Sequence, residues 1–238
     1  MKKIILLLSL LAGTNAFAQT ELPKGLLYGG LTVNLSGENS ENENKNGAVT
    51  VTGEPTKTSY FNIQPEISYY IANNLAIGLS IGFSGRSHES TTKTTTPDVT
   101  TVMLDKTNGP SARVFCRKFW GIRESFFVFG GVSLNTEMGN GTYTVTRTEN
   151  NVSTEVKSES EMRRFSAGFN AGMAYHISQR FMLIGEFSAL NFYSQTNKNN
   201  IQADSYSQLK RSGMNLFFAS GSIPFNFGFI YLLNSKSK

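Results

Sequence analysis

The chain has 238 residues, which suits one domain after removal of an export signal. Cys116 is its only cysteine, so an intrachain disulfide is excluded, and two histidines leave little material for a zinc site. The formal charge is +5, but the chain contains no run of Lys and Arg, which argues against nucleic acid as a partner. No cofactor is implied.

The first 18 residues have the three parts of a secretory signal peptide. Lys2-Lys3 is a basic start, residues 4–12 are apolar, and Ala16-Phe17-Ala18 is a small-residue cleavage site. The apolar stretch is much shorter than the about 20 residues that a membrane-spanning helix needs. We expect residues 1–18 to be removed and residues 19–238 to be exported, with a charge that falls from +5 to +3 without the two lysines.

Period-2 alternation dominates the rest of the chain, and residues 75–86 show it most clearly. From Leu75 to Phe83 every second residue is Leu, Ile or Phe, and the residues between them are Ala, Gly and Ser. A soluble sandwich would carry Thr, Lys and Glu on its exposed face, where Gly is disfavoured. Small residues suit the narrow interior of an eight-stranded barrel, and the uncharged apolar face suits lipid. The pattern therefore predicts a membrane barrel.

Short and long connections alternate along the chain, as they do between the periplasmic turns and external loops of outer-membrane barrels. We expect brief turns at 73–74, 118–124 and 178–180, and long polar extracellular loops near 37–58, 87–109, 136–162 and 193–209. The expected strands cover about 26–36, 59–71, 75–86, 110–118, 125–135, 163–177, 181–192 and 212–233. The predicted fold class is all-β, an eight-stranded antiparallel up-and-down transmembrane β-barrel with both termini in the periplasm.

The end of the chain carries a second, independent indication of this fold. Residues 226–233 follow the pattern polar, any, Gly, any, any, aromatic, any, apolar. The four specified positions are Asn226, Gly228, Tyr231 and Leu233. The pattern resembles the C-terminal signal by which outer-membrane barrels reach the barrel-assembly machinery, although this chain continues to Lys238. The whole mature chain resembles the small OmpX-like and OmpW-like barrels and the OmpA transmembrane domain of Gram-negative bacteria. The resemblance implies fold and outer-membrane location, and those families differ in function.

Two prolines interrupt the expected strands. Pro65 lies in the second strand and Pro224 in the last, where each removes a hydrogen-bond donor from the ladder. We expect β-bulges to accommodate them, and Ser220-Gly221-Ser222 offers a site for one before Pro224.

Several charged residues face the predicted lumen. Alternation places Glu66, Arg113 and Glu186 on the inner surface, each about seven residues from a periplasmic turn, with Arg117 and His176 lower on the same surface. Because ionised groups in a narrow lumen are costly unless they are paired, we expect a polar network formed by Glu, Arg and Glu.

The lumen has two interpretations. Phe115, Phe127 and Phe129 also point inward, and together with the polar network they favour a plugged barrel with a structural or surface-interaction role. The alternative is a narrow channel for small apolar or amphipathic solutes, as the OmpW-like resemblance implies. Electrical recording separates the two.

Basic residues also gather at the external ends of the strands. Arg163 and Lys210 face outward by alternation and are placed to contact lipopolysaccharide phosphates, so outer-membrane lipid and lipopolysaccharide are expected partners. The equally weighted alternative is that they are solvated strand ends.

A third and distant functional hypothesis is a lipid-modifying enzyme. His88-Glu89-Ser90 has a His-x-Ser spacing that resembles part of the lipid A deacylase site. Glu89 points to the opposite face, so an acid to orient the imidazole would have to come from elsewhere. The surrounding loop is rich in Ser and Thr, and we predict no catalytic residue.

The loops themselves contain strand signals. Thr and Val alternate in residues 142–148 and 152–158, with Glu149-Asn150-Asn151 as the expected tip between them. We therefore expect some strands to continue beyond the bilayer as an exposed hairpin, whose edges would suit an extracellular protein partner.

Overall fold

The computed structural model describes residues 21–46, 49–95, 98–202, 205–216 and 225–234. These residues form antiparallel β-strands, and among them no helix is long and apolar enough to cross a membrane. The strands are β1 (Leu27–Asn46), β2 (Val49–Ala72), β3 (Leu75–Thr95), β4 (Asp98–Arg123), β5 (Phe126–Glu149), β6 (Val152–His176), β7 (Phe181–Gln202), β8 (Ser205–Leu216) and β9 (Phe225–Leu232).

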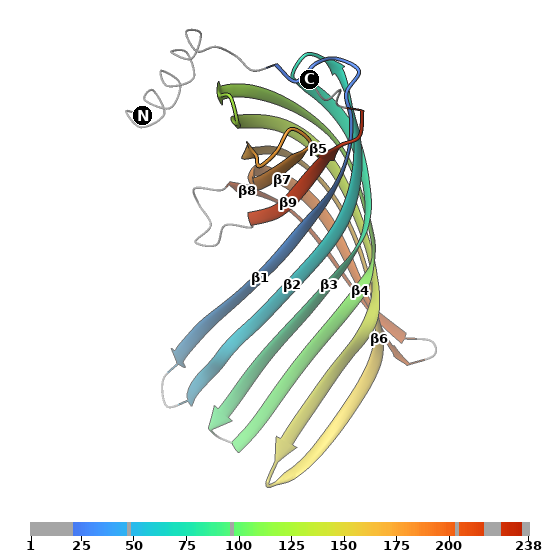
Figure 1. Ribbon diagram of the computed structural model, residues 1–238. Coiled ribbons are helices and arrows are strands. Elements are labelled where there is room, and N and C mark those ends of the chain that lie inside the picture. Colours follow the sequence, from blue (N-terminus) through green and yellow to red (C-terminus); the bar gives the residue numbers. More distant parts are fainter. Residues whose placement is uncertain (1–20, 47–48, 96–97, 203–204, 217–224, 235–238) are drawn as a thin grey trace.

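The strands form one closed ring. Each strand from β1 to β7 pairs with the next, and β9 pairs with both β1 and β7 (Figure 1). β8 pairs with a more distant stretch of β7, from Leu190 to Gln202. The ring therefore has eight positions, with β8 and β9 sharing the eighth, which confirms the predicted eight-stranded antiparallel barrel. The expectation of one strand over 212–233 is wrong, because β8 ends at Leu216 and β9 begins at Phe225. The expected bulge at Pro224 lies outside the described residues.

The strands are longer than predicted. β1 to β7 have 20 to 26 residues, whereas a strand needs only about 9–11 to cross a bilayer. Much of what the sequence analysis assigned to the four long loops is paired strand, so the sheet projects from one end of the barrel (Figure 1). Because β5 and β6 stay paired up to Glu149 and Val152, the expected exposed hairpin is confirmed. At its tip Asn150 and Asn151 both have positive φ, as a type I′ turn requires.

Pro65 is accommodated without the expected bulge. It lies opposite Leu31, and the β1–β2 register is continuous across it. The β2–β3 register is also the same on both sides, although Gln64 and Pro65 have no paired residue on β3. Pro65 therefore removes a local pairing and leaves the alternation of faces intact.

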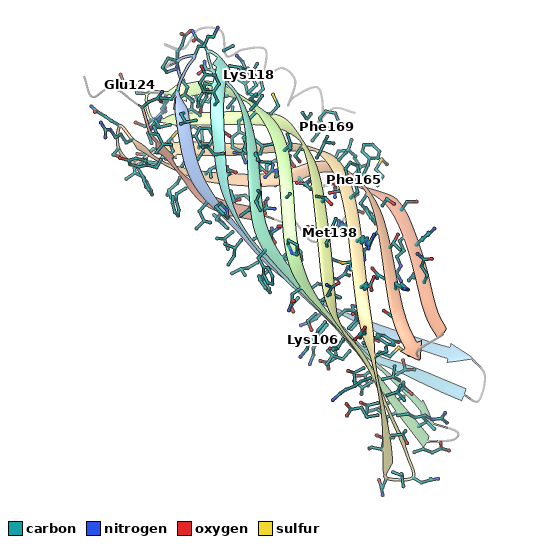
Figure 2. The ribbon with its side chains drawn as sticks, turned by 90° about the vertical axis from the view of Figure 1, so that its right-hand side faces the viewer. Lys106, Lys118, Glu124, Met138, Phe165 and Phe169 are labelled. Carbon is teal, nitrogen blue, oxygen red and sulfur yellow. The ribbon has the colours of Figure 1, made fainter. Side chains whose placement is uncertain are left out.

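The outer face of the ring is apolar and exposed. Ile81 is 62% exposed and Phe227 is 67% exposed, while polar and charged side chains such as Glu186 are buried inside the ring. Phe165 and Phe169 lie on the outer side of β6 (Figure 2). This inversion of the usual burial pattern is what contact with acyl chains requires.

A short segment before β1 closes the end of the barrel where β1 begins and β9 ends. Leu22 and Leu26 are buried there, and Leu22 exchanges hydrogen bonds with Asn74 in the β2–β3 turn. Asn234 accepts a hydrogen bond from the Leu27 amide and donates one to the Gly25 carbonyl. We call this end of the barrel the base, and the opposite end, from which the sheet projects, the mouth.

Candidate functional site: the lumen of the barrel

Four charged side chains meet in the middle of the lumen, and we call them the lumen cluster: Glu66 on β2, Arg113 and Arg117 on β4, and Glu186 on β7. Arg117 donates from Nη1 to Glu66 Oε1 at 2.7 Å, and its Nη2 lies 2.9 Å from Glu186 Oε2. Arg113 forms an ion pair with Glu186. Tyr28 is part of the same network, because its hydroxyl accepts a hydrogen bond of 3.2 Å from Arg117.

The lumen cluster is buried and electrically balanced. Arg117 is 1% exposed and Glu186 is 2% exposed, and two guanidinium groups face two carboxylates. The planar Arg117 group also lies 4.0 Å from the centroid of the Phe115 ring, which orients it. Because a buried charge without a partner costs several kcal/mol, each member of the lumen cluster depends on the others.

Below the lumen cluster the lumen is filled by apolar side chains, which we call the base cluster. Its rings lie in contact, with centroid separations of 5.9 Å from Tyr70 to Phe119 and 5.3 Å from Phe119 to Phe129. Its other members are Leu22, Leu26, Tyr28, Ala76, Phe127, Ala174, Met182, Ile184, Ile230 and Leu232. Beside the lumen cluster, the β3 glycine Gly78 makes room for the Phe115 ring that contacts Arg117, because a Cβ there would lie 2.4 Å from that ring.

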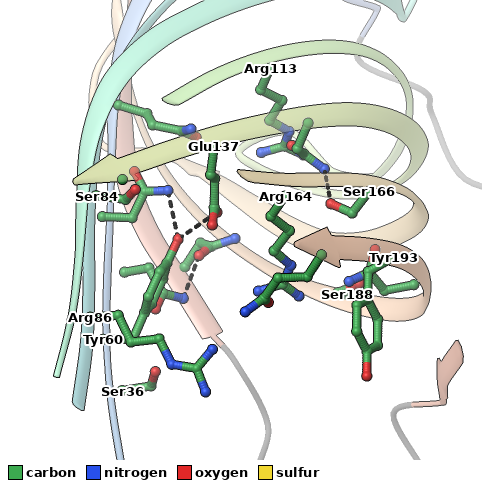
Figure 3. A pocket seen from close by; sticks show the side chains of 18 of the residues that line it. Ser36, Tyr60, Ser84, Arg86, Arg113, Glu137, Arg164, Ser166, Ser188 and Tyr193 are labelled. Atoms are coloured by element: carbon green, nitrogen blue, oxygen red, sulfur yellow. Dashed lines mark hydrogen bonds between the residues drawn. The ribbon is translucent and has the colours of Figure 1, made fainter. Parts of the chain in front are cut away.

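Above the lumen cluster lies a cavity of about 430 Å³, which we call the vestibule. Its walls carry Asn, Ser, Thr and Gln side chains together with Tyr60 and Tyr193, and its floor includes Arg113 and Glu186 (Figure 3). Tyr60 donates a hydrogen bond of 2.9 Å to Glu137 and accepts one from Asn62. The lumen thus has an apolar base, a charged middle and a hollow, polar mouth.

Three further arginines line the vestibule: Arg86 on β3, Arg164 on β6 and Arg211 on β8. Within the described residues none of them forms an ion pair. No site was predicted from the sequence for these arginines. The same is true of Tyr28, Tyr60, Glu137 and Tyr193, although the alternation of faces along each strand was sufficient to place them inside the barrel.

The other residues singled out in the sequence lie elsewhere. His176 is not part of the lumen cluster, since its ring contacts Phe127 and its Nδ1 lies 3.2 Å from the Ser178 carbonyl oxygen at the base. His88 shares a hydrogen bond of 2.9 Å with the Thr58 hydroxyl. Arg163 and Lys210 lie on the outer face, each opposite Thr196 in the register.

The residues of the expected assembly pattern lie on or just beyond β9. Asn226 accepts a hydrogen bond from Asn34 on β1, and Gly228 lies opposite Thr32 where a Cβ would meet the Leu31 carbonyl at 2.4 Å. Tyr231 and Leu233 are exposed on the outer face. These residues therefore hold the contact between β9 and β1 and face lipid.

Several solved structures are similar to this chain. OprG from Pseudomonas aeruginosa is 12% identical, with 89% of this chain and 97% of that chain covered and a TM-score of 0.38. The CymD monoaromatic hydrocarbon channel is 10% identical, with 89% of each chain covered and a TM-score of 0.35. Ail, the attachment invasion locus protein of Yersinia pestis, is 11% identical in its complex with the heparin analogue sucrose octasulfate, with 88% and 99% covered and a TM-score of 0.32.

A comparison with curated proteins gives no match. The family model of the outer membrane protein beta-barrel domain matches residues 4–208, which is most of the chain. The exposed apolar outer face and the closed ring of antiparallel strands are what that family requires. The chain therefore belongs to the outer membrane protein β-barrel domain family.

Proposed function

We propose that this chain is a closed outer-membrane barrel that does not conduct solutes through its lumen. Its role is structural or lies in surface interactions made by the mouth. The observation that carries the proposal is the filled cross-section below the vestibule. Arg117 is 1% exposed, with carboxylates on two sides and an aromatic ring against its face. An ion that moved from the mouth to the base would have to pass both the lumen cluster and the base cluster.

Planar-bilayer recording tests the closed lumen. The purified mature protein should give no steady unit conductance, because the lumen cluster is held by paired charges and the base cluster by packed rings. A triple variant, Arg117→Ala with Phe119→Ala and Phe129→Ala, should introduce conductance, whereas Arg147→Ala on the exposed hairpin should not. A steady unit conductance of the unmodified protein would refute the proposal.

The proposal also needs the mouth to face outward. Short turns at the base and a long projecting sheet at the mouth support a base in the periplasm. Cysteine labelling tests this in a Cys116→Ser background. Asn150→Cys at the hairpin tip should react with a membrane-impermeant maleimide on intact cells, whereas Ser178→Cys at the base should react only after the outer membrane is permeabilised. The opposite pattern would reverse the orientation.

Two partners follow from this orientation. The outward pair Arg163 and Lys210 would contact lipopolysaccharide phosphates, and the projecting sheet would meet an extracellular protein. Replacing both residues by Glu should lower the amount of lipopolysaccharide that co-purifies with the barrel, because it replaces two attractive charges by two repulsive ones. Unchanged co-purification would leave them as solvated strand ends. Enzymatic activity is not part of the proposal.

A second candidate function is the passage of small apolar or amphipathic solutes, and one observation favours it. Beyond Asn34, β1 pairs only with β2 among the described residues, and β8 pairs only with β7. Among the described residues, then, no pairing joins β1 to β8 beside the vestibule. This is where the second function would need a sideways exit for a solute into lipid, which would avoid the lumen cluster. Uptake of a labelled aromatic hydrocarbon into cells, with no ionic conductance, is the result that would favour this function.

A further inference from the structure

The three vestibule arginines are brought together by the register of their strands. Arg164 on β6 lies opposite Gln195 on β7, and Gln195 lies opposite Arg211 on β8, so the two arginines flank one glutamine. Arg86 reaches the same space from β3, and it interacts electrostatically with both Arg164 and Arg211. Figure 3 shows Arg86 and Arg164 in this cavity with Tyr60 and Glu137.

The positive charge of the vestibule exceeds its negative charge. The charged side chains that line it are Arg86, Arg113, Arg164, Arg211, Glu137 and Glu186. Arg113 and Glu186 neutralise each other as an ion pair in the floor. Three arginines then face one carboxylate, that of Glu137, which already accepts a hydrogen bond from Tyr60. The lining therefore carries two more positive than negative charges, and outside the lining Asp105 also acts on Arg86.

Arg164 is held in one orientation, and one of its donors is unpaired among the described residues. Arg164 lies 5.2 Å from the centroid of the Tyr193 ring, an arrangement that fixes the plane of its guanidinium group. Its Nε is buried and has no hydrogen-bond partner among the described residues, and the same holds for Nε of Arg113 in the floor. Because buried donors normally have a partner, these two Nε atoms favour an acceptor bound in the cavity. Guanidinium groups match the oxygens of carboxylate, sulfate and phosphate groups in geometry as well as in charge.

We propose that the vestibule is a binding site for a small soluble oxyanion, held by Arg86, Arg164 and Arg211. The cavity of about 430 Å³ is within the about 300–1,000 Å³ range of small-molecule sites. Its Asn, Ser, Thr and Gln side chains suit a ligand with several hydroxyl groups besides the anionic group. The site does not depend on whether the lumen conducts, because all of its residues lie on the mouth side of the base cluster.

Calorimetric titration of the full mature protein in a non-ionic detergent tests the site. The probes are inorganic phosphate, glucose 6-phosphate and, as the uncharged counterpart, glucose. Both phosphates should bind, glucose should not, and added salt should weaken the binding. Arg86→Gln and Arg164→Gln should each lower the affinity on the order of tenfold, because each removes charge-assisted hydrogen bonds.

The chain offers matched controls for these variants. Arg147→Gln removes the same charge from the exposed hairpin, away from the vestibule, and should leave the affinity unchanged. Glu137→Gln should raise the affinity, because it removes the one carboxylate of the lining that lies outside the ion pair in the floor. This test leaves all of the guanidinium groups in place. Heat-modifiable migration of each variant on a gel checks that it is folded.

Three results would overturn the proposal. The first is the absence of phosphate binding at millimolar concentration. The second is an equal loss of affinity in Arg147→Gln and Arg164→Gln, which would show that phosphate responds to the general charge of the protein. The third has two parts: Arg164→Gln loses co-purified lipopolysaccharide, and the unmodified protein binds phosphate only after lipopolysaccharide has been removed. That result would assign the arginines to a lipid headgroup. A conductance of the unmodified protein would refute the closed lumen and leave the site in place.

Discussion

The lumen contains two groups of arginines in two different settings. Arg113 and Arg117 are almost fully buried and have carboxylates as partners, whereas Arg86, Arg164 and Arg211 line a cavity without ion pairs among the described residues. A guanidinium group that is paired inside a barrel supports the structure, and one that is left unpaired beside a cavity is free to contact a ligand. The comparison predicts that variants of the two groups have opposite consequences for stability and for binding.

Arg117→Ala should have the largest effect. It leaves Glu66 without its ion-pair partner and removes one of the two partners of Glu186, and breaking such a buried pair costs about 3–5 kcal/mol of unfolding free energy. Urea unfolding of the protein in detergent micelles measures the loss. Arg147→Ala is the matched control, because the exposed Arg147–Glu149 pair contributes only about 0–1 kcal/mol.

A second variant separates the electrostatic part of this loss of stability from the part that is due to lost packing. Arg117→Met combined with Glu66→Gln keeps much of the volume and removes a buried unpaired carboxylate, so this double variant should be more stable than Arg117→Ala. If Arg117→Ala loses no more than Arg147→Ala does, the lumen cluster is not a determinant of stability.

Arg164→Gln should change stability little. Arg164 has no ion pair among the described residues. Its replacement removes the contact with the Tyr193 ring but also relieves repulsion from Arg86, so the unfolding free energy should change by less than about 0.5 kcal/mol. The same urea titration compares it directly with Arg117→Ala. Equal losses in the two variants would remove the distinction between the two groups of arginines.

The smallest effect concerns the protonation of His88, which lies on the vestibule side beyond the apolar outer belt of β3. Partial burial lowers its pKa below the ordinary histidine value, and the positive charges of Arg86 and Arg211 lower the pKa further, while Asp105 opposes them. The imidazole should therefore be protonated only at a lower pH than a free histidine. Arg86→Gln should raise the pKa of His88, because it removes one positive charge.

An NMR titration measures this shift with an internal reference. The chain has two histidines, and His176 lies at the base, far from the vestibule arginines. Only the His88 signals should titrate at a higher pH in Arg86→Gln. An unchanged His88, or an equal movement of both histidines, would show that the positive field of the vestibule does not reach it.

The sequence was sufficient for properties that depend on one strand at a time. The alternation of residues along β2, β4 and β7 correctly predicts that Glu66, Arg113 and Glu186 point inward, because successive side chains of any strand point to opposite faces. The fold class followed from the same pattern, once the small residues of the inner face were considered.

Relative height in the barrel was less predictable, because it depends on the register between strands. The row of paired residues that starts at Glu186 can be followed around the barrel in two directions. Through β6 and β5 it reaches β4 at Phe119, whereas through β9, β1, β2 and β3 it reaches β4 at Gly109. Rows of paired residues climb around a tilted barrel, so an equal count from the turns is not an equal height. Arg113 and Arg117 lie between the two positions, and Arg117 is the one that joins both carboxylates.

Two other features have no local signal. The segment with Leu22 and Leu26 has no alternation, and it is ordered by contacts with the distant Tyr70 and Asn74. The separation of β8 from β9 depends on how β7 is shared between them. In each case the decisive contacts join residues far apart in the sequence.

Thiol accessibility along the lumen tests most directly the claim that an open vestibule ends in a closed barrel. In a Cys116→Ser background, Asn135→Cys in the vestibule should react with a small, membrane-impermeant thiol reagent added to intact cells. Ala174→Cys in the base cluster, where the residue is 1% exposed, should stay unmodified from the outside. Modification of both cysteines at similar rates would contradict the account, because it would require a continuous aqueous path from the mouth to the base.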